Sequence, residues 1–331
     1  MPSASPEQSA RVEKIGVTHA AVSIASPGKD EDEEKNQDSL MLLETTDGEN
    51  AECQFAIVCD GATSSPYSAA AAQYVSGQVH ALFEEGGLRE AAAALKGMRL
   101  ALLEKPVKMD EGYSALLKSM FEEIVREKYQ SSYQTTFVAV CLKRGETNSE
   151  GMISIKAIGC GDSAVFIFGE DGELHYNNMN LGGELERLEH RSSFTAVLPD
   201  SYDPETNHVL VDFKEYPEDV NLLLCSDGFY DGFTSFKEIR EWLQEHRAEL
   251  TDSGLRDKCL SELHARLNRK KGDDDISFIW LHPVKARGEA EAESSGDGEE
   301  HADAETSERR RPGFLAGLFE AILRLFGLRA R

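Results

Sequence analysis

Positive charge is scarce in this chain of 331 residues. Its 35 lysines and arginines face 60 aspartates and glutamates, which gives a formal net charge of -25. A field of that sign repels phosphate backbones and other anionic surfaces. We therefore expect no nucleic-acid partner.

Paired cysteine motifs are also absent. The cysteines show no C-x₂-C pair and no His–Cys cluster with zinc spacing, and most lie inside apolar runs. This pattern is typical of reduced cysteines in a hydrophobic core. The six cysteines are Cys53, Cys59, Cys141, Cys160, Cys225 and Cys259.

Long apolar segments are missing as well. The first residues, "MPSASPEQSARVEK", contain no apolar stretch of the kind found in signal peptides, and no uninterrupted apolar run reaches membrane-spanning length. We expect a cytoplasmic protein.

Short β-rich runs and amphipathic segments alternate without a compositional break, which indicates one domain over 12–284 after a disordered N-terminus, 1–11. The helical segments are grouped in pairs between the strands, which favours an α+β sandwich over a doubly wound sheet. The expected strands are 16–24, 38–44, 54–60, 135–142, 153–161, 164–169, 208–213, 220–227 and 275–281, and the expected helices are 68–85, 114–129, 236–247 and 254–268.

Two segments follow the expected domain. The first, 285–311, is rich in acidic residues and lacks large apolar residues between 288 and 308, so it predicts a disordered linker. The second, 312–331, begins at Pro312 and predicts an amphipathic helix. Residues 314–328 would extend about 22 Å, too short for a comfortable bilayer crossing. We weigh a surface-lying membrane anchor against docking on the domain or on a partner protein.

Asp-Gly pairs are frequent, and their ordinary role is a turn. Asp47-Gly48 and Asp171-Gly172 have polar residues on both sides, as expected at hairpin tips. Asp60 and Asp227 instead end the apolar runs "FAIVC" and "LLLC", which do not alternate with polar residues and so predict strands buried on both faces.

A third acidic group, Asp273 to Asp275, precedes the apolar run "ISFIWL". Three carboxylate sites at strand ends can converge at one rim, and carboxylate oxygens without histidine or thiolate ligands suit a hard ion, Mg²⁺ or Mn²⁺. The alternative is that the carboxylates are solvated separately.

Six motifs stand in an order that resembles a known family: "NQDSLML", "VCDGATSS", "YQTTFVAV", "GCGDSAVFIF", "LLLCSDGFYDGF" and "GDDDISFIW". Over about 15–282 the chain resembles the metal-dependent serine/threonine protein phosphatases of the PP2C type. The resemblance implies an αββα sandwich, in which two antiparallel sheets are flanked by helix pairs.

The resemblance also implies roles for single residues. Asp60 matches the aspartate that bridges two metal ions, and the carbonyl of Gly61 completes one metal's shell. Asp227 and Asp274 match ligands of the other metal, and Asp38 matches the residue that orders a metal-bound water.

Two further aspartates, Asp162 and Asp231, match residues that support a third, weaker metal. The family's "GDSR" reads "GDSA" here, with Ala164 in the arginine position, and "YQSSYQTT" lacks the acidic residue usual before its threonines. Both changes argue against a third ion.

The phosphate-contacting residues depart from the family pattern. Glu33 stands where the family has an arginine, so Lys35 or Lys29 would have to supply the positive charge, and we favour Lys35. Ala62 stands where many members have a histidine that acts as general acid.

The resemblance implies metal-dependent hydrolysis of phosphoserine and phosphothreonine in proteins, with water activated by two Mg²⁺ or Mn²⁺ ions. None of the cysteines lies in a C-x₅-R frame, so a thiolate nucleophile is not expected. The alternative is a catalytically weak or inactive module that binds a phosphoprotein or a regulatory partner.

Overall fold

The computed structural model divides the chain into two units, Met1–Ala286 and Arg287–Arg331. It describes residues 18–25, 36–47, 51–84, 86–105, 114–129, 131–143, 151–179, 197–199, 212–251, 259–265 and 274–282, all in the first unit. The segments 1–11 and 285–311 and the expected helix 312–331 lie outside the described residues.

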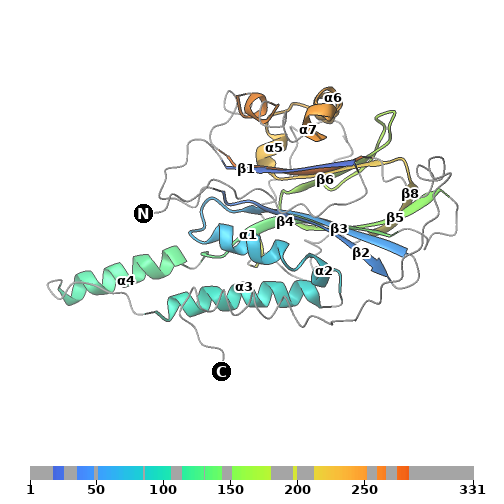
Figure 1. Ribbon diagram of the computed structural model, residues 1–331. Helices are drawn as coiled ribbons and strands as arrows, with labels where there is room; N and C mark the ends of the chain where they lie inside the picture. Colours follow the sequence, from blue (N-terminus) through green and yellow to red (C-terminus); the bar gives the residue numbers. More distant parts are fainter. Residues whose placement is uncertain are drawn as a thin grey trace, which may run out of the picture. The chain divides into compact units, whose positions relative to one another are not determined.

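Ten strands form two antiparallel five-stranded sheets (Figure 1). Sheet 1 has the order β1 (Thr18–Ile24), β10 (Ile276–His282), β9 (Asn221–Cys225), β6 (Ala164–Phe168) and β7 (Leu174–Asn177). Sheet 2 has the order β2 (Ser39–Asp47), β3 (Ala51–Gly61), β4 (Thr135–Lys143), β5 (Met152–Cys160) and β8 (Asp212–Pro217).

The Asp171-Gly172 pair lies at a hairpin connection, as predicted, whereas Gly48 of the other pair lies outside the described residues. Strand β2 ends at Asp47 and pairs with β3, which begins at Ala51. Between β6 and β7, Gly172 has a φ of 86°, a left-handed conformation that favours glycine, and its N–H donates to the Gly169 carbonyl over 2.9 Å.

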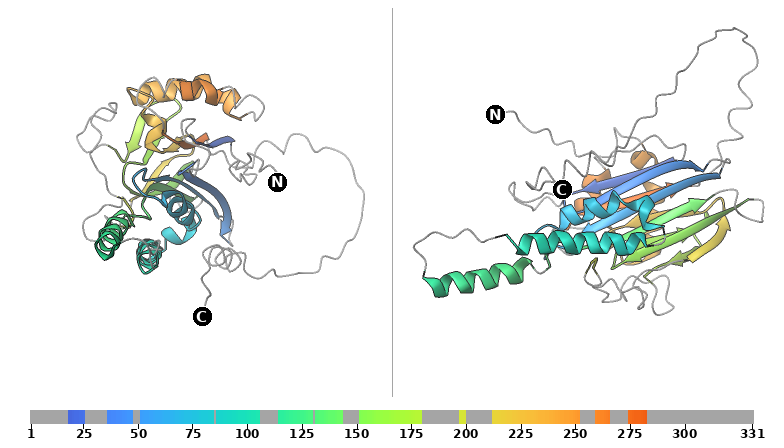
Figure 2. Two further views of the ribbon diagram at one scale, coloured as in Figure 1. Left: turned by 90° about the vertical axis from the view of Figure 1, so that its left-hand side faces the viewer. Right: turned by 90° about the horizontal axis from the view of Figure 1, so that it is seen from below.

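Helices cover the outer face of each sheet (Figures 1 and 2). Over sheet 2 lie α1 (Ser68–Ser76) and α2 (Val79–Leu82), with α3 (Gly87–Leu103) beyond them; α4 (Ala115–Tyr129) contacts α3. Over sheet 1 lie α5 (Asp227–Tyr230), α6 (Phe236–Glu245), α7 (Arg247–Thr251) and the helical residues 259–265. The predicted αββα sandwich is confirmed.

The strands β3, β4, β6 and β9 are buried on both faces, which explains why their sequences do not alternate. In β3, Ala56 and Val58 pack between the sheets, whereas Phe55, Ile57 and Cys59 pack under the helices α1 to α3. Successive side chains on a strand point to opposite faces, so every second residue of β3 faces the same layer.

The cysteines whose side chains the structure describes are core residues, as expected. They are buried and form no disulfide: Cys59, Cys141, Cys160, Cys225 and Cys259. No described helix is both long and apolar enough to cross a membrane.

Several elements differ from the sequence predictions. The expected helix 68–85 is divided into α1 and α2 because Gly77, a poor helix former, ends the first of them. Helix α3 and strand β7 were not predicted. The strand expected at 208–213 overlaps β8 only at its last two residues, and 208–211 lie outside the described part of the chain.

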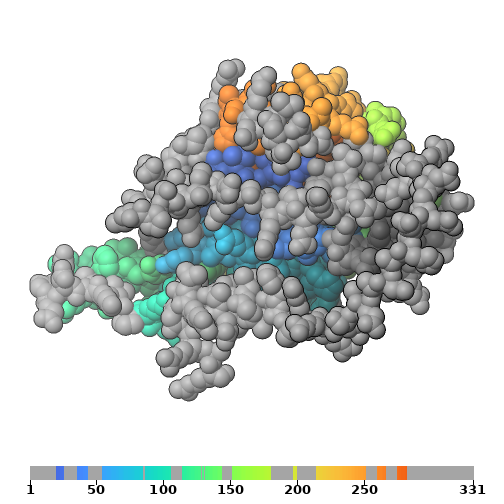
Figure 3. Space-filling model, viewed as in Figure 1, coloured from blue at the N-terminus to red at the C-terminus, as the bar shows by residue number. Residues whose placement is uncertain are grey.

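Helix α4 carries the most exposed apolar surface among the described residues. Leu116 is 71% exposed and Ile124 is 59% exposed, and Leu117, Met120 and Phe121 are also exposed. In the space-filling view, the green surface of α4 extends along one side of the molecule (Figure 3).

Candidate metal centre

Because side chains alternate between the two faces of a strand, several polar residues at strand ends lie in the layer between the sheets. Leu40 and Leu42 of β2 lie in that layer, so Asp38 at the start of β2 shares their face. By the same spacing Asp60 follows Ala56 and Val58 of β3. The inter-sheet core therefore ends in carboxylates.

The end of β3 is fixed by β4. Asp60 pairs with Thr136, and Thr135 Oγ1 donates to the Asp60 carbonyl over 2.7 Å. At Gly61 a Cβ atom would lie 2.5 Å from the Gln37 carbonyl oxygen, so only glycine allows the backbone to approach this closely. The close packing holds Asp60 beside the segment that leads to Asp38.

Asp227 begins α5 directly after β9, which places its side chain at the same rim. Ser226 joins this position to β10, because the N–H of Ser226 donates to the Ser277 carbonyl over 2.9 Å and the N–H of Ser277 donates to Ser226 Oγ over 3.0 Å. A Cβ on Gly228 would lie 1.9 Å from the Asp275 carbonyl oxygen. Glycine there lets α5 pack against the start of β10.

The neighbouring residues Asp274 and Asp275 have different surroundings. Asp275 is 2% exposed, and its Oδ2 accepts the N–H of Gln37 over 2.7 Å. Asp274 is exposed, and its Oδ1 accepts the N–H of Asp275 over 2.9 Å. Asp275 thus connects β10 to the residue before Asp38, while Asp274 lies at the surface of the cluster.

The buried carboxyl of Asp38 has an altered pKa. Burial and, next, the charge of Asp275 raise the pKa of Asp38 to about 7, although hydrogen bonds from Ser277 and Ser226 act in the opposite direction. Its Oδ2 atom is buried and has no hydrogen-bond partner among the described residues.

Asp60 is subject to the same effects. Burial raises its pKa well above the ordinary value, and the charges of Asp38, Asp227 and Asp274 raise it further. Every charged neighbour that shifts these two carboxyl groups is another carboxylate. The structure therefore brings Asp38, Asp60, Asp227 and Asp274 into one electrostatic cluster that lacks a compensating cation among these neighbours.

Such a cluster fits divalent metal ions. Its donors are carboxylate oxygens, which suit hard ions such as Mg²⁺ and Mn²⁺. A buried carboxylate without a hydrogen-bond partner in a low-dielectric site has a raised pKa. Asp38, with its buried Oδ2, has both properties. A bound cation would give the Oδ2 atom a partner and would offset the repulsion among the carboxylates.

Asp162 and Asp231 are connected through Tyr230. The Tyr230 hydroxyl donates to the Asp162 carbonyl over 2.9 Å, and Asp231 directly follows Tyr230 at the end of α5. Ala164, in the position of the family's arginine, is fully buried in the core beneath the helices of sheet 1. Lys35 and Glu33 lie outside the described residues.

The nearby thiols are poor nucleophiles. Burial and the charges of Asp38 and Asp60 raise the pKa of Cys59 well above its usual range. Burial and Asp162 raise the pKa of Cys160 to about 12. Both thiols therefore stay protonated at neutral pH, which agrees with the expectation of no thiolate nucleophile.

Several polar residues of this rim were not identified from the sequence. Thr136 and Ser163 are buried, and their hydroxyl oxygens lie 2.7 Å apart. Ser277 donates its hydroxyl proton to Ser23 over 2.7 Å. Each of these residues lies an even number of positions from an inter-sheet core residue of its strand. The alternation of side chains along the strand would therefore have identified them.

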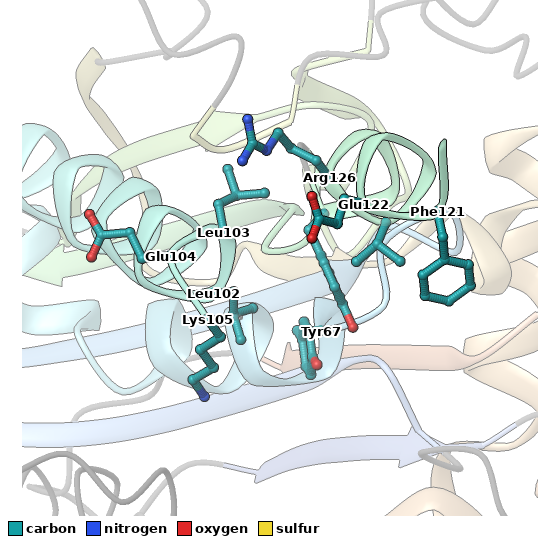
Figure 4. A pocket seen from close by; sticks show the side chains of 10 residues that line it. Tyr67, Leu102, Leu103, Glu104, Lys105, Phe121, Glu122 and Arg126 are labelled. Carbon is teal, nitrogen blue, oxygen red and sulfur yellow. The ribbon is translucent and has the colours of Figure 1, made fainter. Parts of the chain in front are cut away.

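A separate groove of about 550 Å³ lies between α3 and α4 (Figure 4). Leu102 and Leu103 line it from α3, Phe121 and Arg126 from α4, and Tyr67 from the segment before α1. None of the candidate metal ligands lines this groove.

Comparison of the sequence with family models gives one match, to protein phosphatase 2C over residues 28–267. Since this match covers more than two thirds of the 331 residues, the chain belongs to the protein phosphatase 2C family. Comparison with curated proteins gives no significant match.

Comparison with solved structures gives matches of low identity. A bacterial serine phosphatase is 15% identical, with 81% of this chain and 98% of that chain covered and a TM-score of 0.47. RsbX in complex with magnesium is 11% identical, with 82% and 98% covered and a TM-score of 0.45. The S. agalactiae serine/threonine phosphatase is 14% identical, with 80% and 98% covered and a TM-score of 0.41.

Proposed function

We propose that this protein hydrolyses phosphoserine and phosphothreonine in phosphorylated proteins with the help of two Mg²⁺ or Mn²⁺ ions. The observation that supports this most strongly is the cluster of Asp38, Asp60, Asp227 and Asp274 at the strand ends of both sheets. Membership of the protein phosphatase 2C family gives the reaction class.

The ions would be held by Asp60, the Gly61 carbonyl, Asp227 and Asp274. When bound, they would supply an activated water and neutralise charge on the phosphoryl group. Asp38 would orient the attacking water, because its Oδ2 is a buried acceptor without a hydrogen-bond partner among the described residues. We propose Lys35 as the phosphate contact.

The proposal is tested by phosphate release from p-nitrophenyl phosphate and from a phosphothreonine peptide in the presence of Mn²⁺. We expect activity that EDTA abolishes and that Asp60→Asn reduces to the level of the EDTA-treated wild type. Asp171→Asn, which changes a hairpin carboxylate, serves as the matched control and keeps full activity. Equal rates of phosphate release for wild type and Asp60→Asn would contradict the proposal.

The second candidate is a module that binds a phosphoprotein or regulatory partner with little or no turnover. The burial of Ala164 in the core supports the low turnover, because that position offers no cation to stabilise a phosphoryl group during hydrolysis. The two candidates differ in metal dependence. Binding of a phosphothreonine peptide that persists in EDTA, without hydrolysis after Mn²⁺ is added, would support the module.

A further inference from the structure

A second set of metal-binding side chains meets in the helix layer over sheet 1. A ring nitrogen of His246, a Glu249 carboxylate oxygen and Cys259 Sγ all lie within 4.8 Å of one another. His246 follows α6, Glu249 belongs to α7, and Cys259 begins the helical residues 259–265. Glu262 adds a fourth group, since its Oε2 lies 3.7 Å from His246 Nε2.

The orientation of His246 is set by its other ring nitrogen. Nδ1 lies 2.9 Å from the Trp242 carbonyl, and the two rings stack with centroids 4.8 Å apart. A carbonyl oxygen only accepts, so Nδ1 carries the proton, and in the neutral imidazole Nε2 keeps its lone pair. Histidines that bind metals are commonly held by such a bond from the opposite nitrogen to a carbonyl.

This lone pair faces the carboxylates of Glu249 and Glu262, whose side chains are 38% and 57% exposed. His246 is 9% exposed, and its Nε2 lies 3.9 Å from Glu249 Oε2 as well as 3.7 Å from Glu262 Oε2. Acceptors that face one another at this distance repel, and a cation between them would relieve the repulsion.

The distances suit a metal ion better than a shared proton. A protonated imidazole bonded directly to a carboxylate would bring N and O to about 2.8 Å. Any two ligand atoms of a tetrahedral Zn²⁺ ion lie roughly 3.3 to 3.8 Å apart, given bonds of about 2.0 to 2.3 Å. An imidazole and a thiolate are also ligands that Zn²⁺ accepts and Mg²⁺ does not.

We propose that His246, Glu249, Cys259 and Glu262 bind a divalent transition-metal ion of the Zn²⁺ class, at a site separate from the aspartate cluster. On binding, the S–H bond of Cys259 breaks, its proton passes to solvent, and the sulfur binds the ion as thiolate. In the metal-free protein, burial and the charges of Glu249 and Glu262 raise the pKa of this thiol to about 12.

The site would join the end of α6 and α7 to the helical residues 259–265. Trp242, on which His246 stacks, also packs edge-on against Phe229 of α5 at 5.9 Å, two residues after Asp227. A bound ion would therefore brace the helix layer that carries one of the candidate catalytic aspartates.

The test uses Co²⁺, which replaces Zn²⁺ and reports thiolate ligation by a charge-transfer absorption band. Reduced full-length protein titrated with Co²⁺ is expected to show this band, and added Zn²⁺ should remove it. The double variant Asp60→Asn, Asp227→Asn should keep the band, because the aspartate cluster has no sulfur ligand. This result separates the site from the proposed phosphatase centre.

Variants assign the ligands. Cys259→Ser should lose the band, whereas Cys141→Ser, which changes another buried cysteine, should keep it. Glu262→Gln should weaken Co²⁺ binding about tenfold, by analogy with the loss of groups around a metal. Its matched control is Glu241→Gln, since the two side chains are 57% and 58% exposed and neither change should unfold the protein.

Three outcomes would overturn the proposal. The first is a wild-type titration without a thiolate band at excess Co²⁺, and the second is a band that persists in Cys259→Ser. If Cys259→Ser fails to fold, Glu262→Gln decides, and Co²⁺ affinity equal to that of Glu241→Gln rejects the site.

Discussion

The Asp275 carboxylate accepts the backbone N–H of Gln37 over 2.7 Å and so joins the start of β10 in sheet 1 to the residue before Asp38 in sheet 2. Residues far apart in the chain, 37 and 275, thereby fix the rim at which the candidate metal ligands meet. The neighbouring Asp274 is exposed and takes no part in this bond.

Adjacent aspartates should therefore have separable effects. Asp275→Ala leaves the Gln37 N–H without its charged partner and should lower the free energy of unfolding by about 1–3 kcal/mol. Asp274→Ala should leave stability nearly unchanged and weaken Mn²⁺ binding. Urea denaturation in EDTA at about pH 6, where Asp38 carries little charge, measures the first effect. Equal stabilities of the two variants would contradict the assignment.

Gly228 and Gly97 allow the close backbone packing to be tested, because only Gly228 has a backbone atom close to the position of a Cβ. Gly228→Ala would place a Cβ 1.9 Å from the Asp275 carbonyl oxygen, so it should destabilise the protein by about 1–3 kcal/mol and weaken Mn²⁺ binding at the adjacent Asp227. Gly97→Ala in α3 meets no atom within 4 Å and should stabilise by about 0.5–1 kcal/mol. Chemical denaturation checks both, and a neutral Gly228→Ala would show that α5 can shift without loss.

The stability of the metal-free protein should fall as the pH rises through about 7. Asp38 has an ordinary pKa of 3.8 and a folded pKa of about 7, so between these values the native state holds a proton that the unfolded chain has released. That stabilisation is lost above the folded pKa, and the raised pKa of Asp60 acts in the same direction. Denaturation in EDTA between about pH 6 and about pH 8 should show the decline, and Asp38→Asn should flatten it. A stability that rises over this interval would contradict the electrostatic description.

Much of the fold was predictable because a strand that is buried on both faces has an apolar sequence without alternation. The run "FAIVC" predicts a strand between two apolar layers, and β3 has that environment. Helix α3 was missed although Ala91, Leu95, Met98 and Leu102 repeat at helical spacing, because an alanine-rich segment gives a weak amphipathic contrast. The break between α1 and α2 falls at Gly77, a local signal that was passed over because a single glycine inside a helical pattern is often tolerated.

The site was predictable only in part, for a related reason. Asp60 and Asp227 were recognisable because each ends a buried apolar run. The roles of Ser277 and Asp275 depend on strand register and on pairing between distant segments, which a single sequence does not supply. His246 and Cys259 lie on different helices, so no sequence spacing predicts their contact.

The central claim is that the strand-end aspartates form a centre for two cations. Calorimetric titration of the full-length protein with Mn²⁺, a hard ion that prefers carboxylate oxygens to a thiolate, tests it most directly. We predict two bound ions per chain for wild type and for the hairpin variant Asp171→Asn, and loss of this binding in Asp60→Asn. Binding by Asp60→Asn with the stoichiometry and affinity of the wild type would contradict the claim.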